Sequence, residues 1–331
     1  NREVIAEQLD AMAYIMEDCA KKQKNITEEC RSNLQDIAYR ARERGIKVID
    51  EQLWEKENGR WQLVMKVMVK DGCVTTRELT KAVAGALNRR MIPEKDTKTL
   101  IGKGVNLYTY EEEPRFQAIY GVARMVKDGA AVSGDNFSFL EPESGKMVMC
   151  LSDGMGSGSL ACKESEMVIE LVEKFLEAGF DVETAARMMN SAMVMKGQED
   201  LFSTVDISEL DLYDGTCRFY KIGAAATFIR RNGIVECLIS TSLPVGVSYK
   251  LDMEKSEKDL YNGDFLVMVS DGVLEYLHVP NPEETMQEII ESIETNNATI
   301  LAKRILERVL LFTGGKAADD MTVLATAIWE K

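Results

Sequence analysis

The chain has 331 residues, of which 45% are hydrophobic and 29% charged, which is typical of a folded protein with one main domain and a smaller one. Its formal net charge of −15 argues against binding to nucleic acid or to an anionic membrane, because both require a basic face. No stretch approaches the roughly 20 apolar residues that span a bilayer. The chain starts at Asn1, so we expect a cytoplasmic fragment of a longer protein whose membrane anchor lies outside this sequence.

Cysteine and histidine usage narrows the kinds of site that the chain can build. The seven cysteines are scattered without a C-x-x-C pair, which indicates reduced thiols and excludes a zinc site of that pattern. The only histidine is His278, so a histidine-rich metal centre is excluded. Any metal site is expected to use oxygen ligands.

Residues 1 to about 45 are predicted to be helical, because apolar residues recur at three- and four-residue steps on both sides of a polar turn near Asn25. A long helix that precedes a domain can serve as a coupling element or a dimer contact. A stripe of apolar residues at this spacing more often packs against the protein core.

A small mixed unit follows this helical stretch. Strands are predicted at 46–49 and 61–69, and a helix at 75–90. Pro93 and the charged residues after it predict a linker. We therefore expect an N-terminal regulatory region over residues 1–110 and a second domain over 111–331.

From about Gly104 the pattern changes to many short strands interrupted by helices. Helices are predicted at 162–178, at 182–195 with Asp181 as its N-cap, and in a pair over roughly 282–311. Strands are predicted at 105–110, 117–126, 147–151, 205–212, 216–222, 226–230, 235–240, 265–269 and 321–328. Runs of strands with helices inserted between them predict stacked antiparallel sheets flanked by helices, an α+β fold.

Two apolar strands run into the same tripeptide, Ser152-Asp153-Gly154 and Ser270-Asp271-Gly272. Two further acidic motifs flank predicted strands, Gly134-Asp135-Asn136 and Asp319-Asp320-Met321-Thr322. Carboxylates that converge from separate strands repel one another, so they need arginine partners or cations. No arginine neighbours these motifs in sequence. Oxygen ligands without His or Cys select Mg²⁺ or Mn²⁺, and two such ions ~4 Å apart activate a water for attack on phosphorus.

These four motifs, together with Leu243-Pro244-Val245-Gly246, resemble the protein phosphatase 2C superfamily, and within it the bacterial branch that acts in sporulation control. Five ordered motifs over residues 115–331 make the resemblance specific. It implies a four-layer α-β-β-α sandwich of two antiparallel sheets, and a metal-dependent serine/threonine phosphatase.

The resemblance also implies roles for single residues. Asp153 is expected to bridge two divalent cations, Mn²⁺ or Mg²⁺, and the Gly154 carbonyl to reach one of them. Asp271 and Asp319 are expected to ligate the same pair, with Asp135 acting directly or through water. Asp320 is an alternate ligand to Asp319.

The branch also implies partners and a location. The expected substrate is phosphoserine on an anti-sigma-factor antagonist in sporulation control. The division protein FtsZ is a candidate second partner, a homodimer is the expected assembly, and the membrane-anchored parent protein is expected at the division septum.

The sequence departs from the superfamily at two positions that matter for catalysis. The phosphate-binding arginine has no assigned counterpart, and Arg115 and Arg124 are candidates only by proximity to Asp135. A Gly-His pair found in related phosphatases is replaced by residues 222–226, which contain no histidine. His278 is therefore predicted to be structural.

The helices at 162–178 and 182–195 begin directly after the loop that carries Asp153 and Gly154. A shift of the first helix would move the bridging ligand with it, so we expect a regulatory switch, with the helix of residues 1–45 docking on it or pairing with its twin. The plainer alternative is that this N-terminal helix only covers a sheet edge. The residues assigned to the switch are Glu164, Val168, Val172, Ala186, Met189 and Met193.

Two other readings stay open beside the phosphatase. One is a non-catalytic or conditionally active interaction module that keeps the fold. The other is a nucleotide-binding ATPase or kinase relative, suggested by the glycines at 154–158, but Asp153 would face the phosphates with like charge and no Gly-Lys-Ser follows.

Overall fold

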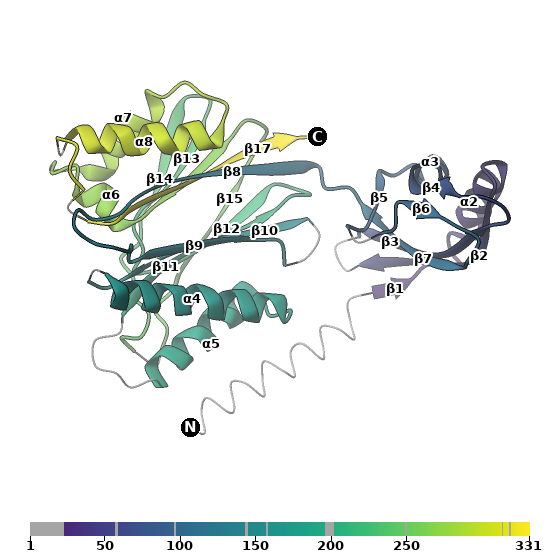
Figure 1. The fold of residues 1–331 in the computed structure, drawn as a ribbon, viewed down its shortest axis with the longest axis horizontal. Helices are drawn as coiled ribbons and strands as arrows, with labels where there is room; N and C mark the ends of the chain where they lie inside the picture. The colour runs from purple at the N-terminus through teal and green to yellow at the C-terminus, as the bar shows by residue number, and fades with distance from the viewer. Residues whose placement is uncertain are drawn as a thin grey trace. The chain divides into compact units, whose positions relative to one another are not determined.

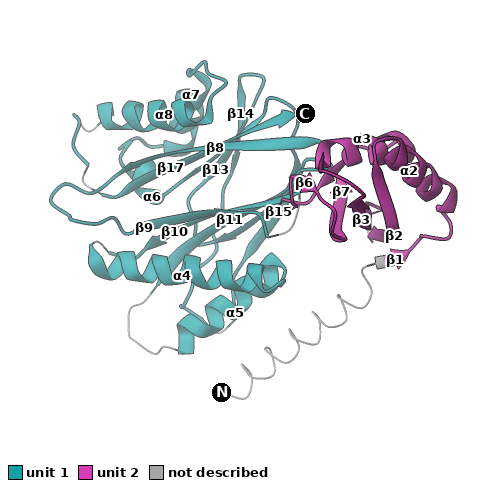
Figure 2. Cartoon of the chain, turned by 45° about the vertical axis from the view of Figure 1, so that its right-hand side comes forward, with its two compact units in different colours: residues 1–11, 114–331 teal, residues 12–113 magenta. Residues whose placement is uncertain are grey.

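The chain forms two compact units, shown in separate colours in Figure 2, with the boundary between Glu113 and Pro114. The computed structural model describes residues 23–56, 59–95, 97–142, 145–156, 158–195, 202–248, 250–312, 314–317 and 319–331. The described part of the smaller unit runs from residue 23 to 113, and that of the larger unit from 114 to 331.

The smaller unit is an antiparallel sheet covered by two helices. The strand order is β1-β2-β3-β7-β5, with bounds Gln23–Asn25, Ile46–Lys56, Trp61–Val69, Asn106–Glu112 and Met91–Pro93. The helices are α2 (Arg31–Glu43) and α3 (Thr76–Leu87), and a two-stranded ribbon joins β4 (Val74–Thr75) to β6 (Leu100–Ile101). Every second residue of β3 from Leu63 is buried, and these side chains form one core with the apolar faces of both helices.

Two predictions for this region need correction. The segment near Asn25, between the two predicted helical stretches of residues 1–45, is more than a turn, because Gln23–Asn25 pair with β2 as strand β1, and the second helix, α2, begins only at Arg31. Residues 1–22 lie outside the described residues. The linker expected at Pro93 is also wrong, because Met91–Pro93 form an edge strand on β7, a position where a proline without an N–H is tolerated.

The larger unit contains two five-stranded antiparallel sheets. The first sheet has the order β15-β12-β11-β10-β9, with bounds Glu254–Asp259, Thr216–Ile222, Ser203–Asp211, Lys146–Gly154 and Asp135–Leu140. The second sheet has the order β14-β13-β16-β17-β8, with bounds Ile234–Leu238, Thr227–Arg231, Phe265–Val269, Met321–Glu330 and Phe116–Met125.

Helices cover the outer face of each sheet. On the first sheet lie α4 (Ser159–Glu177) and α5 (Val182–Met195), and on the second lie α6 (Asp271–Glu275), α7 (Pro282–Glu291) and α8 (Ala298–Phe312), as Figure 1 shows. The predicted four-layer α-β-β-α sandwich is therefore confirmed.

Alternation along the strands divides the core of the larger unit into three layers. On β10, Met149 and Leu151 face the other sheet, while Val148 and Cys150 face α4 and α5. The inter-sheet layer thus receives every second side chain of each central strand. A polar side chain in this layer is unusual, because it lies between the apolar faces of the two sheets.

Candidate active site

Asp135 and Asp153 face each other across two neighbouring strands. Asp135 is the first residue of β9 and Asp153 the penultimate residue of β10, and the two are partners in the antiparallel register. Like charges directly opposite on adjacent strands are destabilising, so this pair requires compensation.

The second sheet brings its acidic residues to the same region. Asp271 begins α6 immediately after Ser270, at the end of β16. Asp319 and Asp320 precede β17, which pairs with β16 through Val269 and Val323. The repeated Ser-Asp-Gly pattern therefore corresponds to one strand end on each sheet.

The electrostatics show how close these carboxylates are. Burial raises the pKa of Asp135, which is 0% exposed, and the charge of Asp271 raises it further. Burial also raises the pKa of Asp153 far above its usual range, with Asp271 and Asp135 as the main neighbouring charges. The three aspartates of the two sheets thus form one interacting group.

The donor set fits divalent cations. Among the described residues, neither carboxylate oxygen of Asp135 accepts a hydrogen bond of ordinary geometry, although Thr322 and Ser270 approach it. Buried anionic oxygens of this kind are stabilised by a cation, and hard oxygen donors select Mg²⁺ or Mn²⁺. In the described part of the chain, no three His, Cys, Asp or Glu side chains are already arranged around one metal position. A complete coordination sphere would also use oxygen donors such as backbone carbonyls and water.

Asp319 and Asp320 have different environments despite being neighbours. Asp320 is 4% exposed, and its two oxygens accept hydrogen bonds from the backbone N–H groups of Lys127 (2.9 Å) and Gly134 (2.7 Å). Asp319 accepts a hydrogen bond from the N–H of Asp320 (3.0 Å) and lies 3.5 Å from Lys127 Nζ, with 35% of its side chain exposed. Asp320 therefore connects the segments that contain Lys127 and Gly134, while the carboxylate oxygens of Asp319 remain accessible.

The backbone of Asp153 is fixed by the neighbouring strand β11. Ser203 Oγ donates to the carbonyl of Asp153 (2.7 Å), and the N–H of Asp153 donates to Thr204 Oγ1 (3.3 Å). The following Gly154 lies against the first turn of α4, where a Cβ would stand 2.1 Å from the carbonyl oxygen of Ala161. Only glycine permits this approach.

A polar latch joins α4 to the Asp135 segment, and the sequence analysis missed it. Asn136 Nδ2 donates to Ser165 Oγ (2.8 Å) and to the carbonyl of Cys162 (3.1 Å), and Ser165 Oγ donates to the carbonyl of Gly134. The partners are 26 to 31 residues apart in sequence, so no local pattern reveals them.

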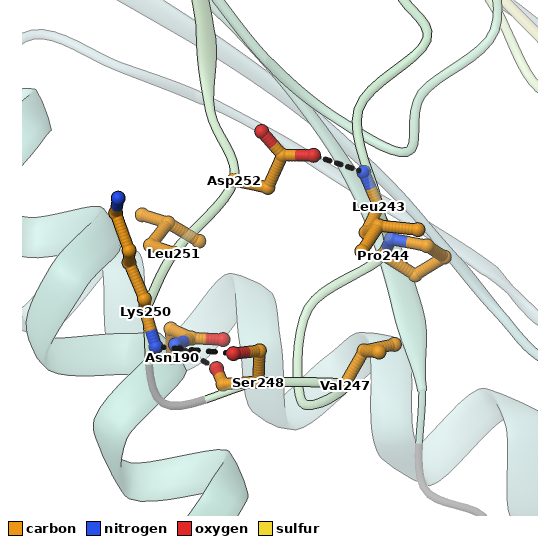
Figure 3. Close-up of a pocket in the computed structure, with 8 residues that line it drawn as sticks. All are labelled: Asn190, Leu243, Pro244, Val247, Ser248, Lys250, Leu251 and Asp252. Carbon is orange, nitrogen blue, oxygen red and sulfur yellow. Dashed lines mark hydrogen bonds between the residues drawn. The ribbon is translucent and has the colours of Figure 1, made fainter.

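The six residues assigned to the switch lie in helices that pack on each other and on the first sheet. Glu164, Val168 and Val172 are buried on α4, and Ala186, Met189 and Met193 are buried on α5. A buried Asn190 on α5 holds the loop after Ser242: its Nδ2 donates to the carbonyl of Ser248 (2.9 Å), as Figure 3 shows. Its Oδ1 accepts a hydrogen bond from the N–H of Gly246.

The two arginines that were candidates for binding phosphate lie at opposite ends of β8. Arg124 pairs in register with Thr322 at the aspartate end of β8, and its guanidinium donates to the carbonyl of Asp135. Arg115 precedes the opposite end of β8 and pairs with Glu330 (3.0 Å), so its candidacy is wrong.

Two further residues near the aspartates were missed from the sequence. Burial raises the pKa of Glu275, and the charges of Asp271 and Asp319 add to the effect. Glu275 follows Asp271 by four residues in α6, a helical spacing that could have revealed it. Lys127 is the second residue that the sequence analysis missed, and its Nζ lies 3.5 Å from Asp319.

His278 lies beyond the end of α6. Its side chain is exposed, and its backbone φ is 48°.

This architecture is that of the protein phosphatase 2C fold. A solved structure of the phosphatase domain and a regulatory fragment of SpoIIE from Bacillus subtilis matches it with a TM-score of 0.71 and 27% identity, over 100% of this chain and 96% of that chain. Residues 143–328, more than half of the chain, match the family model of stage II sporulation protein E (SpoIIE). The chain belongs to the stage II sporulation protein E family.

Curated relatives agree with this placement. Stage II sporulation protein E of Bacillus subtilis is 28% identical over 99% of this chain and 40% of its own length. The chain thus spans well under half of that relative. The phosphoserine phosphatase RsbX of Bacillus subtilis is 35% identical over 26% of this chain and 41% of its own. A solved structure of RsbX in complex with magnesium shares the fold, with a TM-score of 0.50 and 21% identity over 66% of this chain and 98% of that chain. The sporulation-control branch and the phosphatase class predicted from the motifs are those of these relatives.

Six described cysteines are free thiols. Within the described ranges, no helix has the length and apolar character needed to cross a bilayer.

Proposed function

We propose that the chain hydrolyses phosphoserine on a protein substrate, using two divalent cations held at the ends of the two sheets. The observation that carries this proposal is the interacting group of Asp135, Asp153 and Asp271, which joins both sheets and leaves buried carboxylate oxygens without ordinary partners. Membership of the SpoIIE family and the magnesium complex of RsbX support it.

The ligand set is assigned as follows. Asp153 interacts with both Asp271 and Asp135, so it suits a role in bridging two cations. Asp319 is proposed as a ligand in preference to Asp320, because both oxygens of Asp320 already accept backbone hydrogen bonds. The Gly154 carbonyl is the proposed backbone ligand. Divalent cations held by these residues would lower the pKa of a water molecule and so supply hydroxide as the nucleophile at neutral pH.

The chain's own residues would orient the substrate around that centre. Arg124 is placed beside Asp135 by its bond to the carbonyl of that residue. Its guanidinium suits a phosphate oxygen, because its planar fork matches phosphate geometry. Lys127, near Asp319, supplies a second positive charge. The net charge of −15 favours a phosphoprotein with a basic or neutral surface around the phosphoserine.

The proposed substrate is the phosphoserine of an anti-sigma-factor antagonist, which the motif resemblance implies and the name of RsbX as a phosphoserine phosphatase supports. A septal location, a homodimer and a contact with FtsZ stay predictions. The choice between Mn²⁺ and Mg²⁺ also stays open, since both prefer the same oxygen donors.

The test is phosphate release by the full chain from a phosphorylated antagonist protein, with Mn²⁺, with Mg²⁺ and with EDTA. We expect release that requires metal and that distinguishes phosphoserine from phosphotyrosine. Binding of the phosphoprotein without release under any metal condition would favour the interaction module instead.

We also propose that α4 and α5 regulate this site. The Asn136–Ser165 latch and the close approach of Gly154 to Ala161 connect the first turn of α4 to both Asp135 and Asp153. A movement of α4 would therefore shift two ligands together. Ser165→Ala breaks the latch without changing the size of the helix face. We expect it to lower turnover while leaving helix content unchanged by circular dichroism, and unchanged turnover would contradict the coupling.

A further inference from the structure

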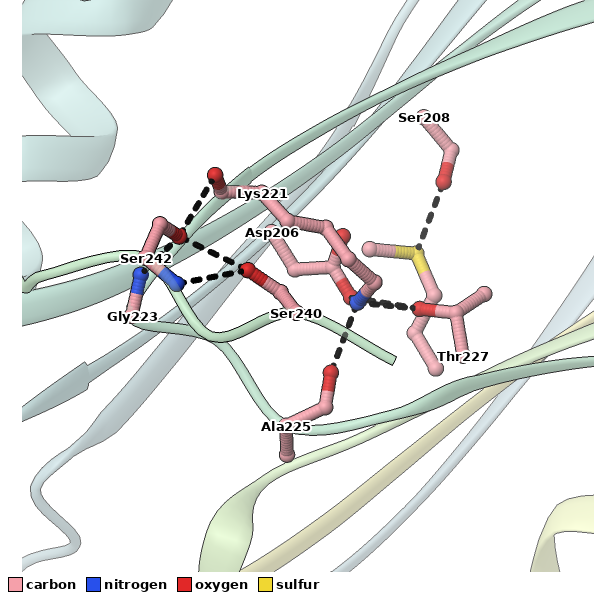
Figure 4. Close-up of polar contacts among 9 residues, drawn as sticks. Asp206, Ser208, Lys221, Gly223, Ala225, Thr227, Ser240 and Ser242 are labelled. Atoms are coloured by element: carbon pink, nitrogen blue, oxygen red, sulfur yellow. Dashed lines mark hydrogen bonds and ion pairs between the residues drawn. The ribbon is translucent and has the colours of Figure 1, made fainter. Parts of the chain in front are cut away.

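A buried ion pair lies between the two sheets. Lys221 is 3% exposed and Asp206 is 2% exposed, and Lys221 Nζ lies 2.5 Å from Asp206 Oδ2. Lys221 Nζ also donates to Thr227 Oγ1 (2.8 Å) and to the carbonyl of Ala225 (2.6 Å), as Figure 4 shows. All three N–H groups of the ammonium are thus used.

The contacts of Lys221 span both sheets. Asp206 on β11 and Lys221 on β12 are register partners in the first sheet. Thr227 begins β13 in the second sheet and donates from Oγ1 to Asp206 Oδ2 (2.6 Å). The three side chains thereby form a closed ring of hydrogen bonds, which we call the inter-sheet strut.

Stability alone does not explain such a strut. Burying two charges costs desolvation energy, and a well-packed apolar pair is often at least as stable. In addition, Asp206 Oδ1 is buried without a hydrogen bond in the described part of the chain. Unlike an apolar pair, the ion pair fixes both the distance and the orientation of the groups that it joins.

Each end of the strut leads directly to a proposed ligand. On the first sheet, Asp206 is two residues along β11 from Thr204, whose Oγ1 accepts the N–H of Asp153. On the second sheet, Thr227 pairs in register with Met268 on β16, the strand that ends just before Asp271.

We propose that Lys221 is a positioning residue: through Asp206 and Thr227 it fixes the separation of the two sheets where Asp153 and Asp271 approach each other. This role rests on the proposed function, because it concerns the geometry of the proposed metal ligands. Lys221 itself touches none of the reacting groups.

The test is Mn²⁺ binding to the full chain by isothermal titration calorimetry, with thermal unfolding and phosphate release measured on the same samples. The main variant is Lys221→Met with Asp206→Val, which replaces the ion pair by apolar side chains. We expect the double variant to stay folded and to bind Mn²⁺ about tenfold or more weakly, as is usual when a residue that orients metal ligands is lost.

The matched control is Arg231→Met with Asp264→Val. Arg231 and Asp264 form a second ion pair with a buried aspartate, at the opposite end of β13 and β16. This control is expected to lower the melting temperature but to keep the Mn²⁺ affinity of the wild type. A loss of Mn²⁺ affinity in both double variants would overturn the positioning role, because it would report general destabilisation.

Mn²⁺ affinity of the Lys221→Met/Asp206→Val variant equal to that of the wild type would also overturn the proposal. If that variant does not fold, Thr227→Val decides, since it removes only the hydroxyl that links the sheets. Weaker Mn²⁺ binding by this variant supports the strut, and unchanged binding contradicts it. A wild type that binds Mn²⁺ but releases no phosphate would contradict the phosphatase proposal and leave the strut standing.

Discussion

At the scale of single residues, Asp319 and Asp320 show how neighbours can differ in role. Asp320→Ala removes the acceptor for two backbone N–H groups, one buried and one partly buried, so we expect the free energy of unfolding to fall by about 2–4 kcal/mol. Asp319→Ala is expected to change stability by less than about 1 kcal/mol and to raise the Mn²⁺ concentration needed for activity. Denaturant unfolding and a metal titration measure the two effects, and the reverse pattern would exchange the two assignments.

The two arginines of the β8 segment provide a matched pair at the same scale. We expect Arg124→Met to lower kcat/KM for the phosphoprotein about tenfold, because a bond from guanidinium to phosphate is lost. Arg115→Met is expected to have no effect on kcat/KM, since it removes an exposed ion pair with Glu330 and a contact with the Phe116 ring, both at the end of β8 away from the aspartates. Steady-state kinetics decide, and equal effects of both variants would remove Arg124 from phosphate recognition.

The acidic residues could be predicted from sequence because each follows or precedes an apolar strand in a short motif. Lys221 and Asp206 could not. A charged residue within a strand normally indicates a solvent-exposed face, and only the stacking of the second sheet buries these two. The contacts of Asn136 with α4 were equally invisible, since they join residues distant in sequence.

At the scale of elements, β10 and α4 approach each other closely beside the site. In Gly154→Ala the new Cβ would overlap the carbonyl of Ala161, so α4 has to move away from the Asp153 strand. We expect turnover to fall about 100-fold, the size of effect that a misplacement of about 1 Å produces. The measurement is phosphate release under saturating metal.

A control for this substitution exists in the smaller unit. A Cβ at Gly102 would meet no atom within 4 Å, so Gly102→Ala is expected to keep the turnover of the wild type. Full activity of Gly154→Ala would show that α4 can shift without disturbing Asp153, contrary to the proposed coupling.

One strand that the sequence analysis did not identify, β15, has little apolar pattern. Its sequence is Glu-Lys-Ser-Glu-Lys-Asp. It is an edge strand, and its extended structure depends on pairing with β12. The central strands β16 and β17 were predicted because they are buried on both faces and read as continuous apolar runs.

At the scale of the whole molecule, each unit has its own hydrophobic core. The core of the smaller unit contains only residues up to Tyr110, and the three core clusters of the larger unit begin at Phe116. We therefore expect residues 114–331, expressed alone, to unfold in one cooperative transition and to bind Mn²⁺. A gradual transition by circular dichroism, or aggregation on expression, would contradict this independence.

The central claim is that carboxylates from both sheets hold the cations that support phosphate-ester hydrolysis. The most direct measurement compares the full chain with Asp153→Asn for phosphate release from a phosphoserine protein, with Mn²⁺ and with EDTA. The account predicts metal-dependent release by the wild type and none by Asp153→Asn. It also predicts that the variant is no less stable without metal, because one of three crowded carboxylates is gone. Equal release by the folded variant, or release by the wild type in EDTA, would contradict the account.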